Sequence, residues 1–318
     1  MELPLSKVQM ARALLARYLT PTRLVAASSI SHLKGTNVWL KLEGELPTGS
    51  FKPRGALYAL HARLQRSAIK GVVASSTGNH GAAVAYAAER FGIPAFIFLP
   101  RNSNPVKRAR IASLGAKIFE EGLDLTGAYR AAATFVEAQG LYFLNDATDP
   151  DLPAGPATIA CEILEAVPQT GSIYVPMGDT ALVRGLAAAA KQISPKVRII
   201  GVQAERAPSY YLSWRKGGVI ATEDCQTIAD GLATRTPDAA NVEAIRESVD
   251  DVRLVSDEEM LSAVRHLLFE EHLVAEPSGA AATAALLQDH GPFPRQVVLI
   301  VSGANVAPEV LRRAIVTK

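Results

Sequence analysis

Short apolar runs alternate along the chain with longer segments whose apolar residues recur at helical spacing. The apolar runs lie at 37–42, 71–75, 95–99, 116–120, 172–176, 197–203, 251–255 and 296–302. They are rich in Val and Ile, and runs of this kind predict buried β-strands. Strands that alternate with helices indicate an α/β fold, in which helices cover both faces of a parallel, doubly wound sheet.

Two of the intervening segments, 81–91 and 256–272, have the pattern of amphipathic helices. Ser256 and Glu259 have the spacing of a capping box, which predicts that the second helix begins there. Pro53 suits the first turn of another helix, because its missing N–H costs nothing at that position.

The composition excludes several classes of protein. Among 318 residues, 33 basic and 31 acidic side chains leave a formal charge of +2, so we expect no nucleic-acid partner. No apolar run approaches membrane-spanning length, and residues 1–19 carry charges where a signal peptide would be apolar. Cys161 and Cys225 stand far apart, without the spacing of a zinc site or a disulfide framework. We therefore expect a cytoplasmic protein that does not bind membranes.

One lysine stands in an unusual setting. Lys52 lies in LPTGSFKPRGAL (46–57), after a predicted strand and at the start of a predicted helix. In a doubly wound sheet, ligands bind beyond the carboxyl ends of the strands. This position suggests that the amine of Lys52 points inward and takes part in chemistry.

The loop SerThrGlyAsnHisGly (76–81) follows one strand and opens an Ala-rich helix. Gly78 and Gly81 let the backbone approach a ligand, and the new helix presents unpaired N–H groups to an anion. Further donors come from the side chains of Ser76, Thr77, Asn79 and His80. The alternative is a capped turn that binds nothing.

A second strand is followed by MetGlyAspThrAlaLeuValArgGly (177–185). Thr180 and the backbone N–H groups would hold a phosphate. Asp179 would repel that phosphate, so we expect it to turn away and cap the helix that starts at 181. The alternative is an ordinary N-cap. Ser302 follows the last strand and would lie at the floor of the same crevice, and Ser278 is placed near the start of another helix.

A lysine amine forms an imine with a carbonyl cofactor, and a glycine-rich helix N-terminus binds phosphate. Pyridoxal phosphate has both groups. The combination of Lys52 with these loops therefore favours pyridoxal phosphate as the cofactor.

With these residues the chain resembles the fold-type II pyridoxal-phosphate enzymes, in particular the group of threonine/serine dehydratases and serine racemase. The resemblance covers nearly the whole chain. Its motifs stand in order at 47–56, 75–88, 154–164, 175–185, 227–233, 276–282 and 301–306. It implies two doubly wound domains with mostly parallel sheets, as in the β subunit of tryptophan synthase. Residues 1–65 and 149–318 would form the large domain, and residues 66–148 a small mobile domain. The resemblance also implies a homodimer.

The resemblance assigns roles to individual residues. Lys52 would form the Schiff base with the cofactor and take the Cα proton, and Thr77 would stand where racemases have a second acid/base. Phe51 would pack by the cofactor, Asn79 would bind the ring hydroxyl and Ser302 would face the pyridine nitrogen. The substrate carboxylate would be bound by Ser76, Thr77, Gly78, Asn79 and His80. The phosphate would be bound by Gly178, Asp179, Thr180, Ala181 and Leu182.

The implied reaction is β-elimination from a small hydroxy amino acid such as L-threonine or L-serine, giving a 2-oxo acid and ammonia. Other readings are threonine synthase, a β-replacement like that of cysteine synthase, an amino-acid racemase, or a relative that binds the cofactor without turnover. Three segments depart from the group: GDTAL (178–182), Thr77, and AsnAspAlaThr (145–148) in place of a ProPhe stretch. Glu205 matches one residue of a divalent-cation site, but Tyr211 replaces the aspartate, so we expect no metal.

Overall fold

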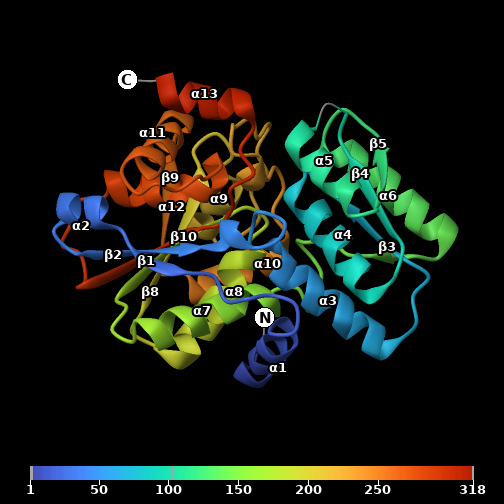
Figure 1. Cartoon of the computed structure of the whole chain (residues 1–318), viewed down its shortest axis with the longest axis horizontal. Coiled ribbons are helices and arrows are strands. Elements are labelled where there is room, and N and C mark those ends of the chain that lie inside the picture. The colour runs from blue at the N-terminus through green and yellow to red at the C-terminus, as the bar shows by residue number, and fades with distance from the viewer. Residues whose placement is uncertain (1–2, 102, 317–318) are drawn as a thin grey trace.

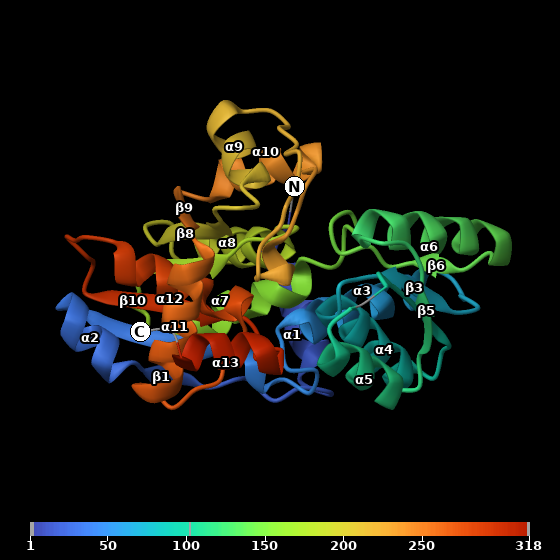
Figure 2. The ribbon, with the colours of Figure 1, turned by 90° about the horizontal axis from the view of Figure 1, so that it is seen from above.

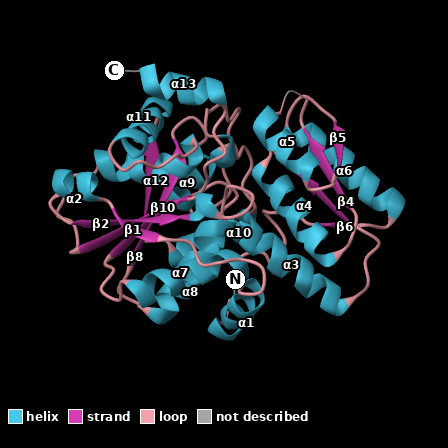
Figure 3. Ribbon diagram, in the orientation of Figure 1, coloured by secondary structure: helices cyan, strands magenta, loops and turns pink. Residues whose placement is uncertain are grey.

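The computed structural model describes residues 3–101 and 103–316, which fold around two β-sheets. Figures 1 and 3 show the larger sheet on one side of the molecule and the smaller sheet on the other. The larger sheet has six strands in the order β1-β2-β10-β7-β8-β9, and only the pairing of β1 with β2 is antiparallel. Its strands are β1 (Leu24–Ala26), β2 (Asn37–Leu42), β7 (Ser172–Pro176), β8 (Arg198–Ala204), β9 (Asp251–Val255) and β10 (Gln296–Val301).

The smaller sheet has four parallel strands in the order β5-β4-β3-β6. They are β3 (Val72–Ser75), β4 (Ala95–Leu99), β5 (Lys117–Glu120) and β6 (Tyr142–Phe143). Helix α6 (Leu125–Gln139) packs on one face of this sheet, where Phe96, Phe98 and Phe119 contact Phe135 or one another. Helices α3 (Lys52–Arg66), α4 (Asn79–Phe91) and α5 (Pro105–Ser113) pack on the other face, as Figure 2 shows from above.

The strands of the larger sheet bury side chains on both faces, as a parallel sheet between helix layers requires. In β10, Val298 and Ile300 pack toward one layer, whereas Val297, Leu299 and Val301 pack toward the other. The first layer includes α1 (Leu5–Leu15), α7 (Ala154–Ala166), α8 (Ala181–Ile193) and α10 (Ala239–Ser248). The second includes α2 (Ser28–Lys34), α11 (Asp257–Phe269), α12 (Pro277–Gln288) and α13 (Pro308–Val316). The remaining elements are η1 (Glu43–Glu45), η2 (Asp230–Leu232) and α9 (Ser209–Lys216).

Most of the predicted elements are confirmed. All eight apolar runs form strands, with ends that differ by a residue or less, and α11 begins with a complete Ser256–Glu259 capping box. Pro53 lies in the first turn of α3. The strands that the pattern did not predict, β1 and β6, have three and two residues and are too short to show an alternation.

The carboxyl ends of β3, β7 and β10 lead into the three loops in which the candidate residues lie. Lys52 begins α3, which connects the larger sheet with the smaller one (Figure 1). The fold therefore brings the lysine and the three loops to one region between the sheets. Within the described part of the chain, no helix is long and apolar enough to cross a membrane.

Candidate active site

A pocket lies between the two sheets, where the strand-end loops meet the start of α3. Of the predicted site residues, all but Gly78 line it: Phe51, Lys52, Ser76, Thr77, Asn79, His80, Gly178, Asp179, Thr180, Ala181, Leu182 and Ser302. Side chains to which the sequence reading gave no role also line the pocket, and they include Asp146, Asp230, Glu276 and Ser278.

Lys52 faces a carboxylate across the pocket. Its Nζ donates a hydrogen bond to Oδ2 of Asp146, 2.6 Å away, and only 17% of the Lys52 side chain is exposed. Burial opposes ionisation of Asp146, but the positive charge of Lys52 prevails and holds the pKa of Asp146 well below its usual range. The reactive amine is therefore held in place by an ion pair between residues 94 positions apart.

The backbone before Lys52 is tied to the end of β10. The N–H of Phe51 donates to the carbonyl of Ser302 at 3.0 Å, and Ser50 pairs with Gly303. A Cβ on Gly303 would stand 2.2 Å from Oε1 of Glu276, so this close approach requires glycine. These contacts bring the start of α3 beside Ser302.

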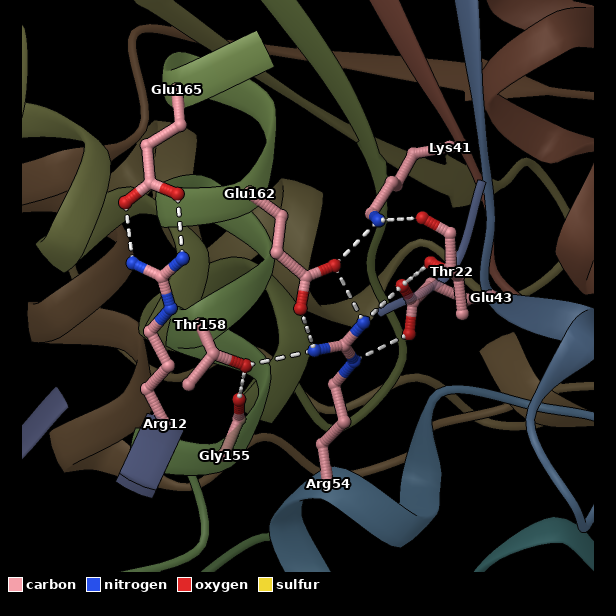
Figure 4. A network of polar contacts seen from close by, with 9 residues as sticks. All are labelled: Arg12, Thr22, Lys41, Glu43, Arg54, Gly155, Thr158, Glu162 and Glu165. Carbon is pink, nitrogen blue, oxygen red and sulfur yellow. Dashed lines mark hydrogen bonds and ion pairs between the residues drawn. The ribbon is translucent and has the colours of Figure 1, made fainter. Parts of the chain in front are cut away.

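Behind Lys52, Arg54 anchors α3 in the interior (Figure 4). Its guanidinium donates to both carboxylate oxygens of Glu43 and of Glu162, and to Oγ1 of Thr158. Arg54 and Glu43 are 3% and 0% exposed. Burial opposes the charged form, but the two glutamates raise the pKa of Arg54 further above its ordinary value. This network explains Arg54 of the FKPRGA motif as an anchor of α3.

The loop before α4 has the geometry of an anion site. Gly78 has φ +149°, and a Cβ there would lie 2.3 Å from Cδ of Lys107. The first backbone bond of the helix runs from Ala82 N–H to the Gly78 carbonyl, at 2.9 Å. The earlier N–H groups, from Asn79 to 81, precede that bond and are available to a ligand. The N–H of Gly78 itself donates to Oγ of Ser76, at 2.8 Å.

His80 is fully enclosed, and its imidazole contacts the carbonyl of Leu144 through Nε2 at 2.8 Å. A carbonyl only accepts hydrogen bonds, so Nε2 carries the proton. Burial lowers the pKa of His80, which keeps the ring neutral. Nδ1 is then an acceptor, and it has no hydrogen-bond partner among the described residues. An anion in the pocket would therefore meet the backbone N–H of His80 as its donor.

Asn79 is held by two side chains from the loops before α12 and after β10. Its Nδ2 donates to Oε1 of Glu276 at 2.7 Å, and its Oδ1 accepts from Nδ2 of Asn305 at 2.9 Å. An amide nitrogen has two hydrogens, so one remains for a ligand. The other oxygen of Glu276 pairs with Lys107 at 2.9 Å, and Lys107 also pairs with Asp230. Burial opposes the charge, but these two carboxylates raise the pKa of Lys107 above its ordinary value.

The loop before α8 differs from the expectation in one respect. Asp179 does not cap the helix. The N-cap residue of α8 is Thr180, which forms no side-chain cap among the described residues, and Asp179 accepts a hydrogen bond from Thr234 at 3.2 Å. Asp179 lines the pocket, and the next residue, Thr180, has a left-handed backbone with φ +66°. Burial, with the negative charge of Asp146, raises the pKa of Asp179 to about 6.

Arg184 joins two of the segments that depart from the family pattern. Its Nε donates to Oγ1 of Thr180 at 3.0 Å, and its Nη2 donates to the carbonyl of Ala147 at 3.0 Å. Nδ2 of Asn241 donates to the same carbonyl at 2.9 Å. The GDTAL turn and the segment 145–148 are therefore one hydrogen-bonded unit, which carries Asp146 into the pocket.

Ser302 and Ser278 lie side by side on the wall of the pocket. Oγ of Ser302 is 3.4 Å from the carbonyl of Ser278, and Oγ of Ser278 accepts from the N–H of Gly231 at 3.1 Å. Both serines are buried. A serine hydroxyl carries no negative charge, so it does not favour a protonated ring nitrogen as a carboxylate would.

These residues fit a phosphate-bearing aldehyde. The start of α8 offers backbone N–H groups of 181–183 to a phosphate, since the first helical bond comes from Arg184 N–H to the Thr180 carbonyl. A lysine amine and a hydroxyl, Lys52 and Ser302, line the same pocket. Among the described residues, no three histidine, cysteine, aspartate or glutamate side chains are grouped as metal ligands would be.

Several known proteins are similar to this chain in sequence and in fold. Residues 15–303 match the family described as pyridoxal-phosphate dependent enzyme. L-Threonine ammonia-lyase of Thermotoga maritima is 36% identical over 311 residues, which are 98% of this chain and 78% of that protein. The structure of maize serine racemase has a TM-score of 0.92 at 31% identity, covering 98% of this chain and 96% of that one. A pyridoxal 5'-phosphate-dependent aspartate racemase has a TM-score of 0.93 at 25% identity and covers 98% of both chains. The chain belongs to the family of pyridoxal-phosphate-dependent enzymes.

Proposed function

We propose that the protein is a pyridoxal-phosphate-dependent lyase that converts L-threonine or L-serine to a 2-oxo acid and ammonia. The observation that carries this proposal is the position of Lys52, whose amine lies in one pocket with two helix N-termini suited to anions. The 36% identity with a threonine ammonia-lyase supports the choice of reaction.

The cofactor, when bound, supplies an aldehyde carbon that reacts with amines and a conjugated ring that draws electrons from the substrate Cα. Residues of this chain would hold it as follows. The turn 178–182 would bind the phosphate, Asn79 would donate to the ring hydroxyl, and Ser302 would face the ring nitrogen. Phe51 would pack beside the ring.

The substrate carboxylate binds at the start of α4. Backbone N–H groups of Asn79 and His80, with the hydroxyls of Ser76 and Thr77, are its donors. The positive end of the helix dipole adds to the attraction. Gly78 contributes by its conformation, because its own N–H is engaged by Ser76.

Lys52 then removes the proton from the substrate Cα as a general base. Its Nζ lies beside Asp146, which fixes the amine at one position in the pocket. Loss of the proton and of the β-hydroxyl eliminates water, and hydrolysis of the C–N bond gives the 2-oxo acid and ammonia.

Closure of a small domain would exclude water from this reaction. We propose that residues 66–148 form that domain and that residues 1–65 and 149–318 form the larger one. The four-stranded sheet lies within 66–148. The pair of Lys107 with Asp230 and Glu276 joins the two sides of the pocket, which suits a closed arrangement.

The test is an assay of protein purified with the cofactor. L-Threonine and L-serine should each yield ammonia and a 2-oxo acid without a second substrate, and Lys52→Ala should lose both this activity and the visible absorption band of the covalently held cofactor. Product that forms only when sulfide or another nucleophile is added would overturn the lyase in favour of β-replacement.

Chiral analysis of the same incubation tests racemisation. Thr77 lines the pocket with a hydroxyl, and the fold is that of maize serine racemase. A lyase without racemase activity leaves no D-serine. Accumulation of D-serine faster than pyruvate would make racemisation the main reaction.

We also propose that the protein is a cytoplasmic homodimer. Cys161 and Cys225 are free thiols, as a reducing compartment favours. Two-fold dimers are the commonest assembly among soluble oligomeric proteins. Light scattering that gives the mass of one chain, 33.8 kDa, would overturn the dimer.

A further inference from the structure

Four carboxylates among the described residues line the pocket. Asp146, Asp179, Asp230 and Glu276 all face it. Asp230 and Glu276 share Lys107, and Asp179 accepts a hydrogen bond from a hydroxyl. Asp146 differs from the other three, because its cation is Lys52 itself.

The position of Asp146 is fixed by the backbone around it. Oδ1 of Asn145 accepts from the N–H of Ala147 at 2.8 Å, and the carbonyl of Ala147 accepts from Arg184 and Asn241. Three segments of the chain therefore hold the turn that presents this carboxylate, and 18% of its side chain is exposed.

The geometry also determines which part of a substrate Asp146 would meet. Lys52 must bring Nζ to the Cα proton, so Cα lies within about 3–3.5 Å of Nζ during the reaction. The β-substituent is only two bonds from Cα. The start of α4 would take the α-carboxylate and the cofactor the amine, which leaves the β-substituent as the remaining group near Lys52. Oδ2 of Asp146 is 2.6 Å from Nζ of Lys52, so this carboxylate is within reach of that substituent.

We propose that Asp146 determines which β-substituents the enzyme accepts, by taking a hydrogen bond from a neutral donor and by repelling an anionic group. This proposal rests on the proposed function, because it uses Lys52 as the base. When Lys52 gives up its charge to act as a neutral amine, Asp146 needs another donor. The hydroxyl of serine or threonine supplies one.

The substrate class that follows is a small amino acid with a hydroxyl or another neutral donor on Cβ, and not one with a β-carboxylate. The fold alone does not exclude a substrate with a β-carboxylate, since an aspartate racemase has the same fold. Two like charges within about 5 Å in a partly buried site repel strongly enough to lower affinity at least about tenfold.

L-Asparagine and L-aspartate are a matched test pair, since they differ in charge at the β-substituent and hardly in shape. Binding of each to the cofactor-loaded protein is measured by isothermal titration calorimetry. Wild type should bind L-asparagine at least about tenfold more tightly than L-aspartate. Asp146→Asn should reduce that ratio of affinities at least about fivefold, mainly because L-aspartate then binds more tightly.

Asp224→Asn is the matched control, because Asp224 is an exposed carboxylate outside the pocket. It should leave the ratio unchanged. If Asp146→Asn fails to fold, Asp146→Ser makes the same comparison with a smaller side chain. Equal binding of the two amino acids by wild type, no binding of L-asparagine, or a ratio that survives removal of the Asp146 charge would each overturn the proposal.

The outcomes separate this proposal from the proposed function. Elimination from threonine or serine without selectivity between asparagine and aspartate would overturn the role of Asp146 alone. Selective binding that depends on Asp146, in a protein that releases no ammonia, would overturn the lyase alone.

Discussion

Arg54 and Glu43 form a buried bidentate ion pair, in which Nε and Nη2 of the arginine lie 2.8 and 2.9 Å from the two carboxylate oxygens. Glu43 also accepts from Thr22, and Glu162 links Arg54 to Lys41 (Figure 4). The network connects β2 and η1 with α3 and α7. Its central residue, Arg54, stands two residues after the reactive Lys52. Its function is to hold the start of α3.

Arg54→Met should lower the free energy of unfolding by about 3–5 kcal/mol, because it leaves Glu43 buried without its cation. Arg54→Lys keeps the charge but loses the fork geometry, so it should restore only part of that stability. Chemical denaturation followed by circular dichroism measures both effects.

Arg12→Met is the control for this experiment. Arg12 also pairs with a glutamate of α7, Glu165, but the two side chains are 40% and 57% exposed (Figure 4). Its loss should cost about 1 kcal/mol or less. Equal losses of unfolding free energy for Arg54→Met and Arg12→Met would show that the buried network stabilises the protein no more than an exposed ion pair does.

Gly155 marks the closest approach of α7 to α3. A Cβ at this position would stand 2.1 Å from the carbonyl oxygen of Arg54 and 2.2 Å from its carbon. Backbone atoms cannot move aside without separating the helices, so Gly155→Ala should destabilise the protein by about 3 kcal/mol. The rate of elimination should fall as well, because α3 carries Lys52.

Gly218→Ala is the matched control for Gly155→Ala. Nothing lies within 4 Å of a Cβ at Gly218, so the change should stay within about 0.5 kcal/mol. Thermal denaturation and threonine turnover are measured on both variants. A Gly155→Ala protein as stable as Gly218→Ala would mean that the helix contact can relax.

The sequence predicted the strands well because each is a short, mostly apolar run between segments of helical or turn character. It also predicted which loops would meet, since carboxyl ends of parallel strands share an edge. The residues that it missed are charged and amide side chains whose direction depends on tertiary packing. Glu276 and Asn305 stand in two of the motifs, 276–282 and 301–306, near Ser278 and Ser302. No local pattern shows that Asp146 would reach Lys52 from 94 residues away.

The expectation for Asp179 failed for a similar reason. An aspartate before a helix usually caps it. Here Thr180 has φ +66°, and the side chain of Asp179 reaches Thr234, on a different loop. Nothing in the sequence GDTAL indicates the left-handed backbone of Thr180 or the contact of Asp179 with Thr234.

Asp179→Asn should stabilise the protein at neutral pH. The pKa of Asp179 is raised to about 6 in the folded state, chiefly by burial, against about 3.9 when unfolded. Between these values the folded state binds more protons, so the contribution of Asp179 to stability falls as the pH rises from about 4 to 6.

Asparagine avoids this loss and still accepts the hydrogen bond from Thr234. The variant should therefore exceed wild type by about 1–3 kcal/mol at pH 7.5 and by much less at pH 4.5. Urea denaturation at the two pH values measures the difference. A gain that is equal at both would exclude titration of Asp179 as its cause.

The ion pair between Lys52 and Asp146 makes a prediction that needs no cofactor. Lys52→Met leaves Asp146 without its ammonium, so it should destabilise the protein more in the wild-type background than in the Asp146→Asn background. A double-mutant cycle on the cofactor-free protein should give a coupling free energy of about 1–2 kcal/mol at pH 7.

The pKa of Asp146 is lowered in the folded state, chiefly by Lys52 against the opposing effect of burial. The coupling is therefore complete above about pH 4, the unfolded value, and declines as the pH falls toward the lowered one. A coupling near zero at pH 7 would mean that Asp146 does not hold the amine.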